Sequence, residues 1–356
     1  MSTSNPLTTG WAQPQDPYEQ FGGGGPIKDL ENLFKAWTGS QYAVAVNSAT
    51  MGLEGLIRGI GLGRGDEVIT TPLTVGATIG PLLRCSVTII FADTDPETGN
   101  IDPKAVQELI TSKTRLILAV DLFGRPHDTE TLRRIADKHS IHYFADAAQS
   151  LGATINGRQA SHAAHARVHS FTTGKTIYAG EGGIVLTDDT ELYEYLLWET
   201  QHPARQHHAL GWNGQNEFGL NGRINPFGAE HAVRTFDQAT NDLEEKQERY
   251  FRLIQALNET GLTVPIRINP AEERPAFFRL SALWKDRPQP VRLLRSLKEQ
   301  VIEAMLHPLP FTPLHQHPYL DLWRDIRVFI PETLKNADDF TRRAVCITHR
   351  EPRPGL

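Results

Sequence analysis

Short apolar runs alternate with amphipathic helical patterns up to about residue 200. Apolar runs rich in β-branched residues predict strands at 42–46, 67–71, 87–91, 115–120, 141–145, 167–171 and 183–187. Helical spacing of apolar residues predicts helices at 103–111, 128–139 and 190–200. Strands that alternate with helices form a mainly parallel sheet with helices on both faces. We therefore expect an α/β fold built on one large sheet.

A different pattern follows in the rest of the chain. From Ala229 to Leu257 the apolar residues keep helical spacing and the opposite face is charged, which predicts one long bridging helix. The patterns after this helix predict a strand at 276–284, a helix near 291–303 and a Pro- and His-rich stretch at 307–319. Together they indicate a smaller α+β domain.

The domain organisation follows from these patterns. The first residues lack apolar periodicity and include a glycine run at 22–25, so we expect an arm without fixed structure. The predicted units are a flexible N-terminal arm at 1–25, a large domain at 26–235, and a bridging helix with the small C-terminal domain at 236–356.

Composition excludes several classes of function. The 356 residues are 39% hydrophobic and 22% charged, which is ordinary for a soluble globular protein. A net charge of -6 suggests no basic face for nucleic acid, and no apolar stretch is long enough to span a membrane. Cys85 and Cys346 lie outside any Cys-x-x-Cys pair, so we expect neither a disulfide framework nor a cysteine zinc site. With no signal-peptide pattern, the cytoplasm is the expected location.

Three histidines lie close together in the sequence and raise the question of a metal site. His162, His165 and His169 occupy a polar connection that leads into a predicted strand. They lack a companion cluster of carboxylates, so we expect no metal there.

Lys175 is the first candidate for chemistry. It precedes the run Gly-Glu-Gly-Gly at 180–183, whose glycines allow other groups to approach the backbone closely. A lone lysine is more often a solvated surface charge, and a glycine-rich turn is often only a turn. Residues at other predicted strand ends decide between these interpretations.

An acid and an anion cradle are predicted at the same edge of the sheet. Asp146 directly follows a predicted strand, where α/β proteins bind ligands, although an aspartate there can also be a helix N-cap. Ser48, Ala49 and Thr50 open a helix after another strand, which offers free N–H groups to a phosphate. An imine-forming amine, a carboxylate and a phosphate cradle are what pyridoxal 5'-phosphate (PLP) requires. We therefore predict a PLP site.

The chain also resembles the DegT/DnrJ/EryC1/StrS family, in blocks that keep the family's order. They cover about residues 25–235, with a weaker match at Pro313-Leu-His315. The blocks are Asn-Ser-Ala-Thr at 47–50, Gly-Asp-Glu-Val-Ile at 65–69, Gly-Asn-Ile-Asp at 99–102, Phe-Gly-Arg-Pro-His-Asp at 123–128, Asp-Ala-Ala-Gln-Ser at 146–150, the stretch 170–183 around Lys175, and Gly-Leu-Asn-Gly-Arg at 219–223.

The resemblance implies a fold and an activity. The fold is that of PLP-dependent transferases of fold type I, the aspartate aminotransferase type. The activity is transfer of an amino group from glutamate or glutamine to a keto group on a sugar nucleotide or cyclitol. Lys175 would form the imine with PLP and carry the proton, and Asp146 would hold the pyridinium proton. Gln149 would bond the phenolic oxygen of the ring or its surroundings, or serve only as a turn-capping amide.

Further residues are assigned to the cofactor phosphate by the same resemblance. Ser170 would bind it together with the Ser48, Ala49 and Thr50 cradle, unless its hydroxyl simply bonds backbone. Asn221 would reach it across a subunit interface, which implies a homodimer with shared sites. The alternative for Asn221 is a loop residue in left-handed geometry.

Three features depart from the family pattern. Relatives usually place an aromatic residue after Thr74 to stack on the cofactor ring, but this chain has Val75. Ala49 stands where Gly is commoner. The chain also ends soon after 346–350, where the family continues with a terminal helix, so we expect that element to be missing or replaced.

Two alternatives to aminotransfer stay open. One is the PLP-dependent sugar dehydratase branch, in which histidine replaces the family's lysine, so the presence of Lys175 argues against it. The other is a non-catalytic regulatory homologue that binds the cofactor, which the departure at Val75 keeps open.

Overall fold

The computed structural model describes residues 21–211, 216–322, 328–331 and 334–349 of the chain. Most of the predicted N-terminal arm, residues 1–20, therefore lies outside the described residues. Among helices of the described part, none combines the length and the apolar character needed to cross a membrane.

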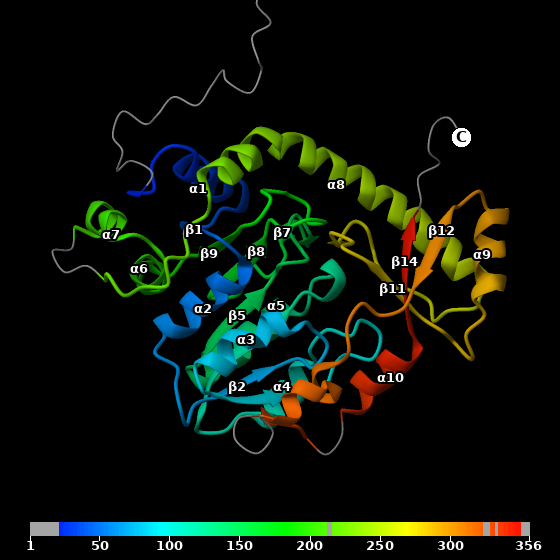
Figure 1. Cartoon of the computed structure of the whole chain (residues 1–356). Helices are drawn as coiled ribbons and strands as arrows, with labels where there is room; N and C mark the ends of the chain where they lie inside the picture. Colours follow the sequence, from blue (N-terminus) through cyan, green and yellow to red (C-terminus); the bar gives the residue numbers. More distant parts are fainter. Residues whose placement is uncertain (1–20, 212–215, 323–327, 332–333, 350–356) are drawn as a thin grey trace, which may run out of the picture.

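An eight-stranded sheet forms the centre of the structure, and Figure 1 shows it surrounded by helices. In spatial order its strands are β1 (Tyr42–Val46), β9 (Gly183–Thr187), β8 (Ala166–Ser170), β5 (His142–Asp146), β4 (Thr114–Val120), β2 (Glu67–Thr70), β3 (Thr88–Phe91) and β13 (Val328–Phe329). β9 runs antiparallel to both of its neighbours, β1 and β8. All adjacent pairs from β8 through to β13, other than β8 with β9, are parallel. The prediction of a mainly parallel sheet is confirmed.

Helices cover both faces of this sheet because its strands are apolar on both sides. One face packs on α2 (Ala49–Gly59), α3 (Gly76–Arg84) and α6 (Thr190–Thr200). The other face packs on α1 (Pro26–Thr38), α4 (Pro103–Leu109), α5 (Thr129–His139) and the start of α8 (Pro226–Thr260). A further helix, α7 (Pro203–Leu210), follows α6.

The long helix α8 connects this sheet to a second, smaller one. It runs across the top of Figure 1 from α1 toward α9 (Pro290–Glu299). Its last turns form an apolar cluster with α9 and the small antiparallel sheet β11 (Leu280–Leu283), β14 (Ala344–His349) and β12 (Ala304–His307). The predicted domain division at 235/236 stays a prediction, and α8 passes through it without a break.

The remaining elements are short. They comprise α10 (Lys335–Arg343), the small sheet of β6 (Thr154–Ile155), β7 (Arg158–Gln159) and β10 (Glu273–Arg274), and the 3-10 turns η1 (Leu122–Gly124), η2 (Leu314–Gln316) and η3 (Pro318–Leu322).

The structure differs from the sequence prediction in the C-terminal part. Only 280–283 of the predicted strand 276–284 is a strand, because Phe277 adopts a left-handed backbone with φ 47° that interrupts extended pairing. The predicted helix 291–303 ends at Glu299. The pattern also gave no sign that β13 would join the large sheet, where it lies parallel to β3.

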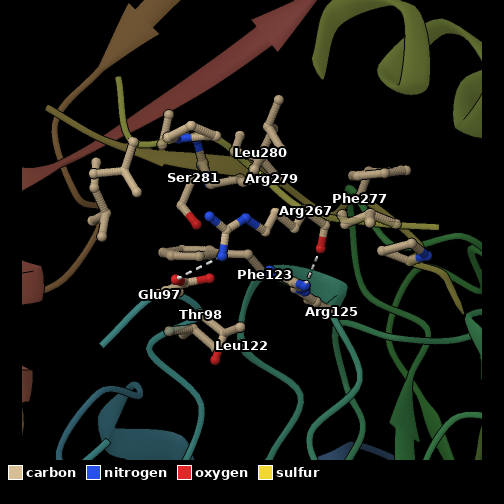
Figure 2. A pocket seen from close by; sticks show the side chains of 17 residues that line it. Glu97, Thr98, Leu122, Phe123, Arg125, Arg267, Phe277, Arg279, Leu280 and Ser281 are labelled. Carbon is tan, nitrogen blue, oxygen red and sulfur yellow. Dashed lines mark hydrogen bonds and ion pairs between the residues drawn. The ribbon is translucent and has the colours of Figure 1, made fainter. Parts of the chain in front are cut away.

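Figure 2 shows a pocket lined by the η1 turn and by the segment that leads into β11. Arg125, just after the η1 turn, donates from Nη2 to the backbone oxygen of Arg267 at 3.1 Å and pairs through Nε with Glu273 at 2.8 Å. Ala276 N donates to Gly124 O at 2.9 Å, so backbone and side chains both tie the segment before β11 to the large sheet. These contacts hold the segment before β11 against the η1 turn, which follows β4.

Candidate functional site

Asp146 is the last residue of β5, near the middle of the large sheet, and is only 7% exposed. Its Oδ2 accepts a hydrogen bond from Thr78 Oγ1 at 2.7 Å, and its Oδ1 accepts one from Ala148 N at 3.1 Å. Burial raises the pKa of this carboxyl, while both hydrogen bonds and the charge of Lys175 act in the opposite direction. Each oxygen keeps a lone pair for another donor.

Lys175 lies in the turn after β8, where Lys175 N donates to Thr172 O at 3.2 Å. Its Nζ lies 4.1 Å from the ring centroid of Phe278, which comes from the segment before β11. Burial lowers the pKa of the lysine and the charge of Asp146 opposes this effect. The two groups are thus close enough for each to influence the ionisation of the other. The joint cofactor site predicted from the sequence stays a prediction.

The anion cradle lies at the end of β1. Ser48 caps α2 by accepting from Met51 N at 3.1 Å. The N–H groups of Ala49 and Thr50 occupy the first two helical positions and have no acceptor among the described residues, as expected at a helix start. An anion placed there would receive these N–H groups and the positive end of the helix dipole.

Ser170, at the end of β8, lies beside this cradle. Gly183 of β9 pairs with Ser170 on one side and with Val46, the last residue of β1, on the other. The Ser170 hydroxyl is 3.3 Å from Thr172 Oγ1. Ser170 and the first turn of α2 therefore flank the same short stretch of β9.

Gly183 lies in close contact with the backbone of two other segments. A Cβ atom at this position would lie 2.7 Å from Ala49 N and 2.7 Å from His169 O, which are both backbone atoms. We expect Gly183→Ala to lower the free energy of unfolding by about 1–3 kcal/mol, because neither backbone can move without disturbing a strand or helix end. Denaturant unfolding measures this. The control is Gly63→Ala, where nothing lies within 4 Å of the added Cβ, and equal stability of the two variants would contradict the packing described here.

The side chain of Gln149 accepts a hydrogen bond from the backbone of the η1 turn. Its Oε1 accepts from Phe123 N at 2.9 Å, which fixes the η1 turn to the turn after β5. Its side-chain NH2 group has no partner among the described residues. The cofactor contact predicted for Gln149 therefore stays a prediction, and that NH2 group is the donor able to make it.

Val75 and Asn221 are both exposed. Val75 occupies the N-cap position of α3 and is 42% exposed, so it is free to cover a ligand at this edge. Asn221 has a left-handed backbone with φ 50°. The next residue, Gly222, accepts from Asn47 N at 2.7 Å through its oxygen, so the Asn221 loop lies beside the cradle of its own chain.

Sequence reasoning missed two side chains that contact the predicted site residues. Thr78 bonds Asp146, and Phe278 contacts Lys175. Thr78 lies in the first turn of α3 and Thr74 four residues earlier, just before the helix, and this spacing indicates that the two side chains face the same way. Nothing local in the sequence brings Phe278 to Lys175, since their contact depends on the fold of the C-terminal part.

The three neighbouring histidines contact different parts of the structure. His162 contacts Glu130 at 2.8 Å, and His165 Nδ1 accepts from Tyr143 N at 3.0 Å. His169 is buried with its Nδ1 3.0 Å from Ala147 O, and burial lowers its pKa to about 4. The described residues hold no group of three or more histidines, cysteines or carboxylates arranged to bind a metal ion.

Comparison with known proteins identifies relatives. The model of the DegT/DnrJ/EryC1/StrS aminotransferase family matches residues 17–352. A pleiotropic regulatory protein of Geobacillus stearothermophilus is 35% identical over 53% of this chain and 52% of its own length. A dTDP-3-amino-3,4,6-trideoxy-alpha-D-glucose transaminase of Streptomyces venezuelae is 34% identical over 54% of this chain and 51% of its own. The match thus spans about half the length of each of these two relatives.

The fold also resembles solved structures over nearly its whole length. An aminotransferase from Psychrobacter cryohalolentis superimposes with a TM-score of 0.75 at 26% identity, covering 91% of this chain and 86% of that one. The prediction of an aspartate aminotransferase type of fold is confirmed.

Proposed function

The chain belongs to the DegT/DnrJ/EryC1/StrS aminotransferase family, and on this premise we propose that it is a PLP-dependent aminotransferase. The proposed reaction moves an amino group from glutamate or glutamine to a keto group on a sugar nucleotide or cyclitol. The observation that carries the proposal is that buried Asp146 ends β5 beside β8, and that the turn after β8 carries Lys175, whose charge acts on the Asp146 carboxyl.

The residues of this edge fit PLP in three respects. Asp146 offers a buried carboxylate with spare lone pairs to a pyridinium N–H. Lys175 offers a half-buried amine whose pKa is lowered by burial, which favours the neutral form needed to attack a carbonyl. The N–H groups of Ala49 and Thr50, together with Ser170, offer donors to the phosphate.

Each side chain has a defined task in this proposal. When bound, the cofactor supplies an electron sink that stabilises negative charge on the substrate carbon. Lys175 would hold the cofactor covalently and, as a free amine, would carry the proton from that carbon to the cofactor. Asp146 stays ionised and keeps a proton on the ring nitrogen. Val75 lies at the same edge, where its small side chain would cover one face of the ring.

The substrate class rests on the relatives. The Streptomyces venezuelae relative is by name a transaminase that makes an amino sugar attached to a nucleotide. A test is to incubate the purified enzyme with glutamate or glutamine and a panel of keto sugars and keto cyclitols, and to identify aminated products by mass spectrometry. An aminated sugar nucleotide or cyclitol supports the proposal. No aminated product, from a protein that binds PLP, would contradict it.

A regulatory role is the second candidate, and two observations favour it. The relative from Geobacillus stearothermophilus is named as a regulatory protein, and Val75 replaces the aromatic residue usual at the cofactor ring. Adding glutamate or glutamine without a keto acceptor distinguishes the two functions. An aminotransferase converts its bound PLP to the amine form, which changes the visible absorption spectrum, whereas a regulatory protein that only binds PLP keeps its spectrum.

The proposal includes a homodimer whose sites are shared. Asn221 is exposed, and Phe218, three residues before it, is 95% exposed; Phe227 and Tyr178 are exposed aromatic residues as well. Exposed aromatic groups around a polar loop are typical of a surface that a partner covers. In the proposed dimer, Asn221 of each subunit donates to the phosphate at the other subunit's site. The cytoplasm is the proposed location, where Cys85 and Cys346, both free thiols, would stay reduced.

Mixing two inactive variants tests the shared site. We expect Lys175→Ala and Asn221→Ala chains to regain activity when mixed, because one site of each heterodimer then carries neither substitution. With random exchange, half the dimers are mixed and have one intact site each, so roughly a quarter of the parent activity should return.

The matched control mixes Lys175→Ala with Asp146→Asn chains. Both residues belong to the same chain's site, so every mixed dimer has one substitution in each site and activity stays absent. If heterodimers form but Asn221→Ala chains restore nothing, then Asn221 acts within its own chain, beside Asn47.

A further inference from the structure

A buried chain of hydroxyl groups leads to Asp146 from the side facing α3. Thr74, just before α3, is 1% exposed, and Thr78 in its first turn is 0% exposed. Thr74 Oγ1 and Thr78 Oγ1 are 2.8 Å apart, and Thr78 Oγ1 lies 2.7 Å from Asp146 Oδ2.

The direction of these hydrogen bonds follows from proton counting. A hydroxyl has one proton to donate, and Thr78 gives its proton to the carboxylate of Asp146. The Thr74 hydroxyl must then donate to the Thr78 oxygen. Both dipoles point their positive ends toward Asp146, and such chains strengthen each member through polarisation.

Other helical threonines of this chain use their hydroxyl differently. Several donate to the backbone oxygen four residues earlier, as in Thr38 to Phe34, Thr200 to Leu196 and Thr341 to Ala337. Thr78 instead has the hydroxyl of Thr74 four residues before it. It donates its own proton to the Asp146 carboxylate, 68 positions later in the sequence. The bond links α3 to the end of β5 at the residue on which the proposed chemistry depends.

We propose that Thr78 is a positioning residue that keeps Asp146 ionised and oriented toward the cofactor nitrogen, and that Thr74 acts only through Thr78. The inference rests on the proposed function, because it assigns Asp146 to the cofactor. Its physical basis is the cost of a buried carboxylate. Removing one of the two donors to Asp146 leaves the charge less compensated and raises its pKa.

The test measures PLP binding by apoprotein, by equilibrium dialysis at neutral pH, and needs no turnover. Thr78→Val removes the hydroxyl while keeping the shape, and we expect the dissociation constant for PLP to rise about tenfold, as for loss of a hydrogen bond to a charged group. Thr78→Ser keeps the hydroxyl and should stay within about threefold of the parent. Thr78→Ala removes the hydroxyl without adding bulk and replaces Thr78→Val if that variant does not fold.

A pH profile separates this role from a merely structural one. Binding requires ionised Asp146, so affinity falls as the pH drops through the carboxyl pKa. Because Thr78→Val raises that pKa, the acid-side midpoint should move upward by about one pH unit. Thr78→Ser should leave the midpoint in place. A midpoint unchanged in Thr78→Val would overturn the inference, since lost packing alone does not move it.

The role of Thr74 is tested by a double-mutant cycle. Thr74→Val alone should weaken PLP binding by about threefold, and it should add no further loss in the Thr78→Val background, because its only route to Asp146 is gone. Additive losses would overturn the chain of bonds. A parent protein that binds no PLP contradicts the proposed function itself, whereas a parent that binds PLP no better than Thr78→Val contradicts the inference alone.

Discussion

Replacing Lys175 by alanine is expected to leave a folded protein with on the order of 10⁴-fold less transaminase activity. The substitution removes both the amine that holds PLP and the base that moves the substrate proton. It should leave the fold in place because Lys175 is only partly buried and lies in a turn, with its Nζ against Phe278. Initial rates of amino-group transfer with a saturating donor measure the loss.

Two further variants test whether the loss of activity is due to the amine of Lys175. Lys175→Arg keeps a positive charge but offers no nucleophilic amine, so it should be as inactive as Lys175→Ala. Lys104→Ala removes an exposed lysine at the start of α4 and should behave as the parent. If the Lys175→Ala variant were as active as the parent enzyme, the assignment of the cofactor to Lys175 would be wrong.

Asp146→Asn should retain some PLP yet lose activity by about 10³-fold. The amide has nearly the shape of the carboxylate and can still accept from Ala148 N, so the end of β5 keeps its geometry. It cannot form an ion pair with a protonated ring nitrogen, and the electron sink weakens. Steady-state rates with the variant fully loaded with PLP measure this loss separately from weaker binding.

The control for this substitution is Asp237→Asn on α8. Asp237 is exposed and lies away from the end of β5, so the same loss of charge should leave activity unchanged. If turnover in Asp146→Asn equals that of the parent, another group must hold the ring nitrogen.

Much of the large sheet could be predicted because its signals are local. The apolar run at 42–46 coincides with β1, and the run at 183–187 coincides with β9. Strands buried on both faces are nearly continuous apolar runs, so their positions can be read without tertiary information. The expectation that Lys175 and Asp146 lie at one edge of the sheet came from the same strand assignments, since each residue stands at or soon after the end of a strand.

The features that were not predicted depend on distant parts of the chain. β13 is two residues long and pairs with β3, so its apolar pattern is too short to distinguish it from a loop. Phe277 has a left-handed backbone because Gly124 and α8 hold the segment around it, and this conformation sends Phe278 to Lys175. The bond from Thr78 to Asp146 likewise exists only once α3 packs against β5.

Chemical trapping on the loaded enzyme tests the cofactor assignment and the reaction together. The protein is loaded with PLP, reduced with borohydride before and after addition of glutamate, digested, and analysed by peptide mass spectrometry. We predict that reduction before glutamate fixes the cofactor to the peptide that contains Lys175, and that reduction after glutamate leaves this peptide unmodified because the cofactor has left the lysine as its amine form. A cofactor fixed to a different lysine, or to none, would contradict the assignment, and a Lys175 adduct unchanged by every amino donor would contradict the aminotransferase activity.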